Sequence, residues 1–129
     1  MAIKKEIKLR PRKNILVIED DSELIEIIKT HLEILGLNVI TALDGLMGIH
    51  KCGLQKFDAI LCDISMPRLN GSKAVSLIKK SSYNQKTPIF ILSGHIDRFV
   101  LSKIRDHITK VYVKPFPVDQ LCLEINNLI

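Results

Sequence analysis

Apolar residues gather in five short runs along the chain, and a segment with helical spacing follows each run. The runs are Asn14 to Ile18, Leu37 to Thr41, Phe57 to Cys62, Pro88 to Leu92 and Lys110 to Val113. Runs of this length between turn residues predict strands that are buried on both faces. Strands that alternate with helices predict a parallel sheet with helices on both sides.

The segments between the runs predict five helices. In the first, apolar residues recur at helical spacing from Leu24 to Leu35, Asp21 or Ser22 can cap the start, and Gly36 is typical of a helix end. The other helices are expected over 43–54, after the loop that runs through Pro67 to Gly71, over 95–107 and over 118–128; the helix after Gly71 would have Ala74, Val75, Leu77 and Ile78 on one face. The polar segment 81–87 is expected to be a loop. The pattern predicts one α/β domain.

Composition agrees with one cytosolic domain. The chain has 129 residues, of which 47% are hydrophobic and 26% charged, and this excludes a disordered chain. No apolar run approaches the roughly 18 residues of a membrane span, and no signal-peptide core follows Met1. The three cysteines, Cys52, Cys62 and Cys122, form no C-x-x-C pair and are odd in number. We expect them to be reduced and buried as small apolar side chains.

The net charge of +5 comes from the N-terminal segment. Residues 1–13 hold six basic residues and one acidic residue, and the rest of the chain is neutral. A basic arm can bind nucleic acid or an anionic membrane through charge alone. This segment has no aromatic residue to stack on bases, and the sequence shows no second basic patch. We therefore predict a solvated tail or linker over 1–13, a domain over 14–129, and neither nucleic acid nor membrane as a partner.

Residues that can do chemistry stand at the ends of four predicted strands. They are Glu19-Asp20-Asp21, Asp63, Ser93 and Lys114. In open α/β sheets, ligands bind outside the carboxyl ends of the strands. Neighbouring carboxylates repel one another, so a cation would lower their cost, and a set of oxygen ligands suits Mg²⁺. Taken alone, the acidic cluster is equally typical of a helix N-terminus.

Five motifs in this order resemble the receiver domain of two-component response regulators. They are Glu19-Asp20, then Asp63, then Met66-Pro67 followed by Gly71, then Ser93-Gly94 and last Lys114-Pro115. Ser93 stands 30 residues after Asp63, and Lys114 stands 51 residues after it. The resemblance implies a flavodoxin-like (βα)5 fold, a doubly wound five-stranded parallel sheet with strand order 2-1-3-4-5.

The resemblance also implies a role for each site residue. Asp63 would accept a phosphoryl group from a phosphohistidine on a histidine kinase or phosphotransfer protein. Asp20 and Asp63 would bind Mg²⁺ directly, Glu19 through water, and Ser65 through its backbone carbonyl. Lys114 would neutralise the phosphoryl charge, and the Ser93 hydroxyl would bind the group once it is attached. The Lys114–Pro115 bond is expected to be cis, as is typical of the family. The chain would catalyse its own phosphorylation and dephosphorylation, without turning over external substrates.

The sequence departs from the family pattern near its output face, which is formed by the fourth helix, fifth strand and fifth helix. Val111 stands where the family commonly has an aromatic residue, and Tyr112 comes one place later. Alternation along a strand places Tyr112 on the other face, where we expect it to pack against a helix. Ser65 and His95 would flank the entry to the site and tune its rates.

Three other functions are compatible with parts of the sequence. A phosphorylation-independent interaction module would keep the fold without the chemistry. A phosphatase of the haloacid-dehalogenase type needs a second Asp two residues after the first, where Ser65 stands. A nucleic-acid binder would use the basic arm. We expect a monomer or weak dimer with a downstream protein target, which is either a stand-alone regulator or part of a longer protein.

Overall fold

The computed structural model describes residues 11–66, 71–95 and 97–129. Residues 1–10 of the predicted tail, residues 67–70 with Pro67, and Ile96 lie outside the described residues. The strands are β1 (Asn14–Ile18), β2 (Asn38–Ala42), β3 (Ala59–Asp63), β4 (Ile89–Ser93) and β5 (Lys110–Val113). The helices are α2 (Ser22–Ile34), α3 (Gly45–Cys52), α4 (Gly71–Lys80), α5 (Arg98–Ile104), a 3-10 turn η1 (Arg105–His107) and α6 (Val118–Leu128).

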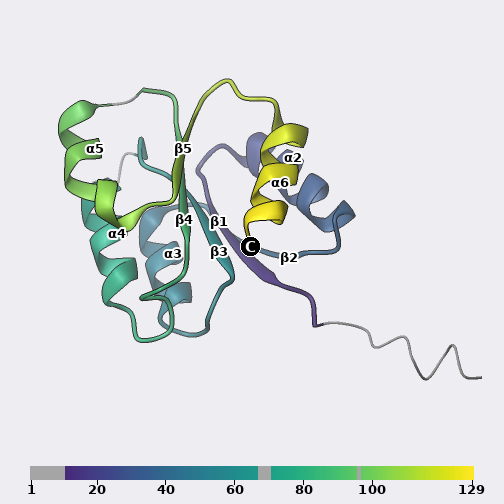
Figure 1. Cartoon of the computed structure of the whole chain (residues 1–129), viewed down its shortest axis with the longest axis horizontal. Coiled ribbons are helices and arrows are strands. Elements are labelled where there is room, and N and C mark those ends of the chain that lie inside the picture. Colours follow the sequence, from purple (N-terminus) through teal and green to yellow (C-terminus); the bar gives the residue numbers. More distant parts are fainter. Residues whose placement is uncertain (1–10, 67–70, 96) are drawn as a thin grey trace, which may run out of the picture.

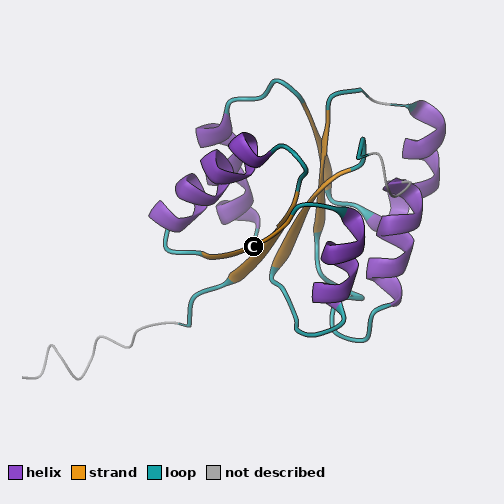
Figure 2. Ribbon diagram, turned by 180° about the vertical axis from the view of Figure 1, so that it is seen from behind, coloured by secondary structure: helices purple, strands orange, loops and turns teal. Residues whose placement is uncertain are grey.

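The strands form one parallel sheet in the order β2-β1-β3-β4-β5. Helices α2 and α6 cover one face, and α3, α4 and α5 cover the other (Figures 1 and 2). The predicted flavodoxin-like fold and strand order are therefore confirmed. Because all strands run in one direction, the sheet has an amino edge, where the strands begin, and a carboxyl edge, where they end.

The sheet separates two apolar layers because side chains alternate along each strand. Ile15, Val17 and Leu61 pack beneath α2 and α6, whereas Leu16 and Cys62 belong to the layer beneath α3, α4 and α5. The residues of β3 and β4 are all buried. Each fully buried aliphatic side chain stabilises the fold by about 1.5–3 kcal/mol.

Element boundaries agree with the predictions to within a few residues, and β5 and α6 agree fully. The largest difference is the predicted helix 95–107. It starts only at Arg98, because Asp97 is its N-cap and accepts a hydrogen bond from the amide of Phe99 at 2.8 Å. The helix then tightens into η1. Asp21, not Ser22, caps α2 and accepts hydrogen bonds from the amides of Glu23 and Leu24.

The three cysteines are free and buried, as predicted. Burial raises the pKa of each thiol to about 12, so the thiols stay protonated near neutral pH. Among the described residues, no helix combines the length and apolar character that crossing a membrane requires.

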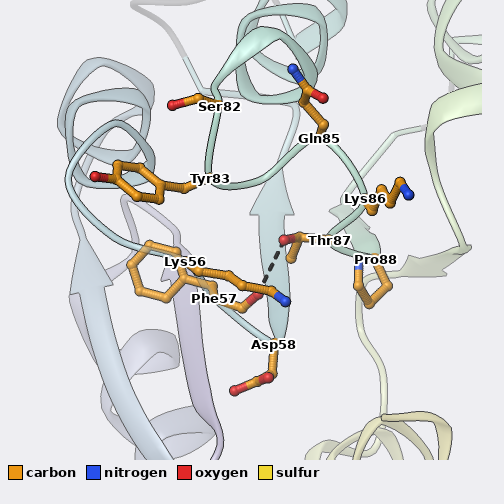
Figure 3. Close-up of a pocket in the computed structure, with 9 residues that line it drawn as sticks. All are labelled: Lys56, Phe57, Asp58, Ser82, Tyr83, Gln85, Lys86, Thr87 and Pro88. Atoms are coloured by element: carbon orange, nitrogen blue, oxygen red, sulfur yellow. Dashed lines mark hydrogen bonds between the residues drawn. The ribbon is translucent and has the colours of Figure 1, made fainter.

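A buried asparagine holds the amino edge together. The Asn84 amide nitrogen donates to the carbonyls of Cys52 and Gln55 at 2.8 and 2.9 Å. Its oxygen accepts hydrogen bonds from the amide of Phe57 and the hydroxyl of Thr87, both at 2.9 Å. The Thr87 hydroxyl also contacts the carbonyl of Phe57 at 3.0 Å (Figure 3). The polar segment predicted as a loop therefore contains a saturated network that joins the loops before β3 and β4.

Gly48 lets α3 approach β1 closely. A Cβ atom at this position would lie 2.3 Å from Cδ1 and 2.7 Å from Cγ1 of Ile18, which is fully buried. Atoms cannot approach so closely, so any larger residue must displace the helix or Ile18.

We predict that Gly48→Ala lowers the free energy of unfolding by about 1–3 kcal/mol, because overpacking a dense core forces side chains off their rotamers. Urea denaturation followed by circular dichroism measures the effect. Gly53→Ala is the matched control, since its Cβ would meet no atom closer than 3.4 Å. Equal stability of the Gly48→Ala and Gly53→Ala variants would contradict the predicted steric conflict.

Candidate functional site

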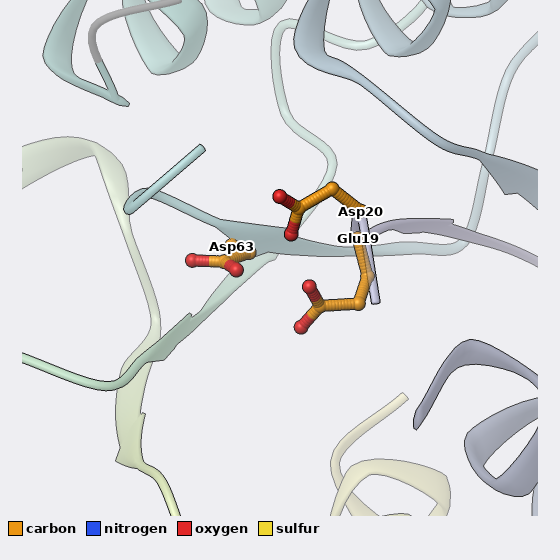
Figure 4. Close-up of side chains that lie close together, drawn as sticks. All are labelled: Glu19, Asp20 and Asp63. Carbon is orange, nitrogen blue, oxygen red and sulfur yellow. The ribbon is translucent and has the colours of Figure 1, made fainter. Parts of the chain in front are cut away.

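The acidic residues predicted as a cluster meet at the carboxyl edge. Glu19 and Asp20 follow β1, Asp63 ends β3, and these two strands are neighbours in the sheet. One carboxylate oxygen from each residue lies within 4.8 Å of the others (Figure 4). Glu19 and Asp63 are buried, with exposed fractions of 0% and 3%, whereas Asp20 is exposed. The cluster is therefore open to solvent on the side of Asp20.

Lys114 links three strand ends. Its Nζ lies 3.0 Å from Asp63 Oδ2, to which it donates a hydrogen bond, and 2.6 Å from Glu19 Oε1. The Lys114 backbone amide donates to the carbonyl of Ser93 at 2.7 Å, which fixes the loop after β5 against the end of β4. The peptide bond from Lys114 to Pro115 is cis, as predicted.

Burial sets the charge state of Glu19. Removal from water raises the pKa of its carboxyl group to about 7, against the lowering effect of Lys114 and with a further increase from Asp63. Burial alone would lower the pKa of Lys114, but the carboxylates of Glu19 and Asp63 together raise it. The Glu19 Oε1 atom is paired with Lys114 by charge, yet no hydrogen bond of good geometry reaches it. At this site, one of the two carboxylate oxygens of Glu19 therefore has an ion pair but no hydrogen bond.

Ser93 is buried beside Asp63 at the end of β4. Its hydroxyl donates to the carbonyl of His95 at 2.5 Å and accepts a hydrogen bond from the amide of His95 at 3.2 Å. It also lies 3.4 Å from the hydroxyl of Ser65, whose amide donates to Asp63 Oδ1 at 2.7 Å. A Cβ atom on Gly94 would meet nothing within 4 Å, so the space beside this residue is open.

The structure brings together all six residues predicted for the site: Glu19, Asp20, Asp63, Ser65, Ser93 and Lys114. Sequence reasoning missed two backbone contacts. The main chain of His95 holds the Ser93 hydroxyl, and the amide of Asp21 donates to Glu19 Oε2 at 3.2 Å. A contact with the backbone leaves no signature in residue type. The one related signal in the sequence was the prediction that Asp21 can cap the following helix, which places Asp21 close to Glu19.

The predicted orientation of Tyr112 is also confirmed. Its ring packs with those of Phe90 and Phe116 at centroid distances of 6.4 and 6.5 Å, in the layer beneath α2 and α6. Val111 belongs to the opposite layer, which faces α5. Tyr112 therefore lies on the far side of β5 from the layer that Val111 joins.

The donor set suits a small hard cation. All its side-chain ligands are carboxylate oxygens, which Mg²⁺ prefers. An octahedral Mg²⁺ with bonds of about 2.1 Å holds ligands about 3 to 4 Å apart. One oxygen of each of the three carboxylates lies within 4.8 Å of the others, so a single ion could be shared by all three residues.

Comparison with known proteins agrees with this geometry. Residues 15–126 match the family model described as the response regulator receiver domain. The chain is 34% identical over 112 residues to the transcription factor SKN7 of Candida albicans, covering 86% of this chain and 20% of that protein. It is also 34% identical over 108 residues to the protein PilG of Pseudomonas aeruginosa, covering 83% of this chain and 80% of PilG. The chain thus spans about a fifth of the length of the first relative and most of the second.

Solved structures agree as well. The receiver domain of the sensor histidine kinase PA1611 from Pseudomonas aeruginosa has a TM-score of 0.75 and 25% identity to this chain, and the match covers 91% of this chain and 97% of that domain. That structure holds a magnesium ion coordinated in its active site cleft. With the matched family model, the strand order and the clustered carboxylates in agreement, this chain belongs to the response regulator receiver domain family.

Proposed function

We propose that the chain is a phosphorylation-dependent signalling receiver in the cytoplasm that takes a phosphoryl group onto Asp63. The observation that supports this most directly is the meeting of Asp63, Ser93 and Lys114 with the acidic pair at one edge of the sheet. The phosphoryl donor would be a phosphohistidine on a histidine kinase or phosphotransfer protein. The output would be a change in affinity for a downstream protein.

In the proposed reaction, an oxygen of Asp63 attacks the phosphorus atom. A P–O bond forms, the P–N bond to the donor imidazole breaks, and the imidazole leaves with the electron pair. Lys114, already 3.0 Å from Asp63, stabilises negative charge on the phosphoryl oxygens. The amide of Ser65 holds the Asp63 carboxylate in one orientation through its 2.7 Å hydrogen bond.

Asp20, Asp63, the carbonyl of Ser65 and, through water, Glu19 would hold Mg²⁺. When bound, the ion supplies positive charge that offsets the three carboxylates and the incoming phosphoryl group. This role is supported by the oxygen-only side chains of the cluster and by the pKa of Glu19, which burial raises to about 7.

The proposed switch is an exchange of partners by Ser93. Its hydroxyl now donates to the carbonyl of His95, and a phosphoryl group on Asp63 would compete for the same proton. Because that contact exists only in the phosphorylated state, it provides the differential interaction that a population shift requires. The open space around Gly94 allows the loop before α5 to move, and the response would reach partners through the face of α5, β5 and α6.

A groove beside the site suits a protein donor. It has a volume of about 300 Å³ and lies between α2 and the loop after β5. Leu24, Ile27 and Phe116 are among its apolar residues, and Lys114 also lines it. We propose that the donor domain docks here, because an apolar helix face in this groove would bring its phosphohistidine to Asp63.

The central test is incubation with acetyl phosphate and Mg²⁺, or with beryllofluoride, followed by intact mass and amide NMR. We expect a Mg²⁺-dependent phosphoryl adduct that is absent in Asp63→Asn, with shifts spreading to Ser93 and α5. Asp106→Asn, an exposed acid in η1, is the matched control and should form the adduct normally. Failure of the wild-type chain to form an adduct or to bind beryllofluoride would refute the chemistry and favour a constitutive interaction module.

Ser93→Ala separates phosphorylation from its transmission. We expect this variant still to form the adduct, with a rate lowered by no more than about 10- to 150-fold, since loss of one hydrogen bond to a charged group costs about 1.5–3 kcal/mol. The chemical shifts of α5 should then stay at their unphosphorylated values. Full shifts in α5 would show that Ser93 is not the switch.

Glu19→Gln tests the electrostatics of the metal-free site. Because the pKa of Glu19 is raised to about 7 from its ordinary value of 4.5, the folded chain binds this proton more tightly than the unfolded chain does. The tighter binding of this proton therefore stabilises the folded chain fully below pH 4.5, and this stabilisation is lost as the pH rises through 7. Glutamine cannot lose a proton. The free energy of unfolding of the variant should therefore equal that of the wild type at low pH and be about 1–3 kcal/mol larger at pH 8 without Mg²⁺.

Urea denaturation at both pH values without Mg²⁺ measures this difference. Calorimetric titration of the wild type should also show weaker Mg²⁺ binding below pH 7, where the metal must displace the proton on Glu19. A variant that is less stable than the wild type at pH 8 would mean that its ion pair with Lys114 outweighs the cost of burying the charge.

A further inference from the structure

Charge is distributed very unevenly along the neutral part of the chain. Residues 14–44 hold seven acidic residues and one basic residue, whereas residues 45–96 hold seven basic and two acidic residues. One of those two acids is Asp63 in the phosphorylation site. The segments from α3 to β4 therefore carry a net positive charge, and the proposed phosphorylation assigns no role to their basic residues.

Part of this charge surrounds a pocket at the amino edge. The pocket has a volume of about 390 Å³ and is lined by three residues of the loop before β3 and six of the loop before β4. Lys56 and Lys86 stand on opposite loops of this pocket (Figure 3). Both are exposed, and neither forms an ion pair with any described residue.

The one acid in the pocket, Asp58, already has a partner. Its Oδ2 accepts a hydrogen bond from the backbone amide of Asn14 at 2.8 Å, which holds β1 against β3. Lys79 adds a third cation nearby, with its Nζ 2.7 Å from the carbonyl of Thr87. The pocket therefore has a net positive charge that the fold itself does not neutralise.

The pocket is also rigid. Asn84 and Thr87 lie buried behind it, and their hydrogen bonds join both loops. Tyr83, Gln85 and Lys86 therefore project from a fixed backbone, and Tyr83 is 52% exposed. A preformed site loses little conformational entropy when it binds.

We propose that this pocket binds an acidic peptide segment of a partner protein. Carboxylates of the segment would reach Lys56 and Lys86, while Tyr83 and Gln85 offer the aromatic ring and amide that protein interfaces favour. Single-stranded nucleic acid fits less well, because it binds on successive aromatic platforms and the lining has one exposed ring and no arginine. Since the site lies at the edge opposite Asp63, a bound segment leaves the phosphodonor groove free.

The test uses the full chain labelled with nitrogen-15 and an octaglutamate peptide as the probe. We expect amide shifts in residues 56–58 and 82–88 and an affinity that falls steeply with salt. Lys56→Glu with Lys86→Glu should weaken binding by roughly tenfold or more, because each change replaces attraction with repulsion. The matched control, Lys29→Glu with Lys103→Glu, makes the same change in net charge on α2 and α5, away from the pocket.

Several outcomes would overturn the proposal. These are shifts confined to the basic N-terminal residues, an equal loss of affinity in the control variant, and binding of octathymidylate at the pocket in place of the peptide. Both lysines are exposed, so the double variant should stay folded and form the adduct with acetyl phosphate as the wild type does. That measurement separates a failure of this site from a failure of the proposed phosphorylation.

Discussion

The ion pairing of Lys114 with Glu19 and Asp63 is the interaction on which the carboxyl edge depends. Both carboxylates are buried, and uncompensated charge in such a place is expensive. Lys114 follows β5, two strands away from β3, so its side chain must pass the end of β4 to reach them. The backbone contact between Lys114 and Ser93 fixes that path. The same four residues therefore hold the edge together and form the proposed reaction site.

The two edges of the sheet differ in how completely their buried polar groups are hydrogen-bonded. At the amino edge, the side-chain amide of Asn84 uses both of its N–H donors and accepts two hydrogen bonds at its oxygen. At the carboxyl edge, Glu19 Oε1 has only an ion pair, and burial raises the pKa of the group to about 7. Buried carboxylates with a raised pKa are concentrated at sites where a ligand or a cation can bind to them. The amino edge is a rigid base, and the carboxyl edge is where chemistry is possible.

The path from the site to the output face also follows from strand alternation. Tyr112 is fixed among Phe90, Phe116 and α6, on the layer opposite to Val111. A movement of Ser93 would therefore act through the loop before α5, where Gly94 has open space around it. Helix α5 itself is short and carries an exposed Phe99, over which Lys103 lies at 4.2 Å. Its few buried contacts make it the element that such a movement can shift most easily.

The sequence by itself determined the five β–α units, because the apolar runs predict the buried strands and the helical spacing of apolar residues predicts the helices between them. It also determined the family, through Asp63, Ser93 and Lys114 at fixed separations and the acidic pair before α2. The hydrogen bond between Ser93 and His95 and the pocket of Lys56 and Lys86 were decided only by the tertiary structure. These features depend on backbone groups, or on loops distant in sequence that the parallel sheet brings to one edge. Local patterns of residue type record neither kind of contact, because their energies arise only after the chain has folded.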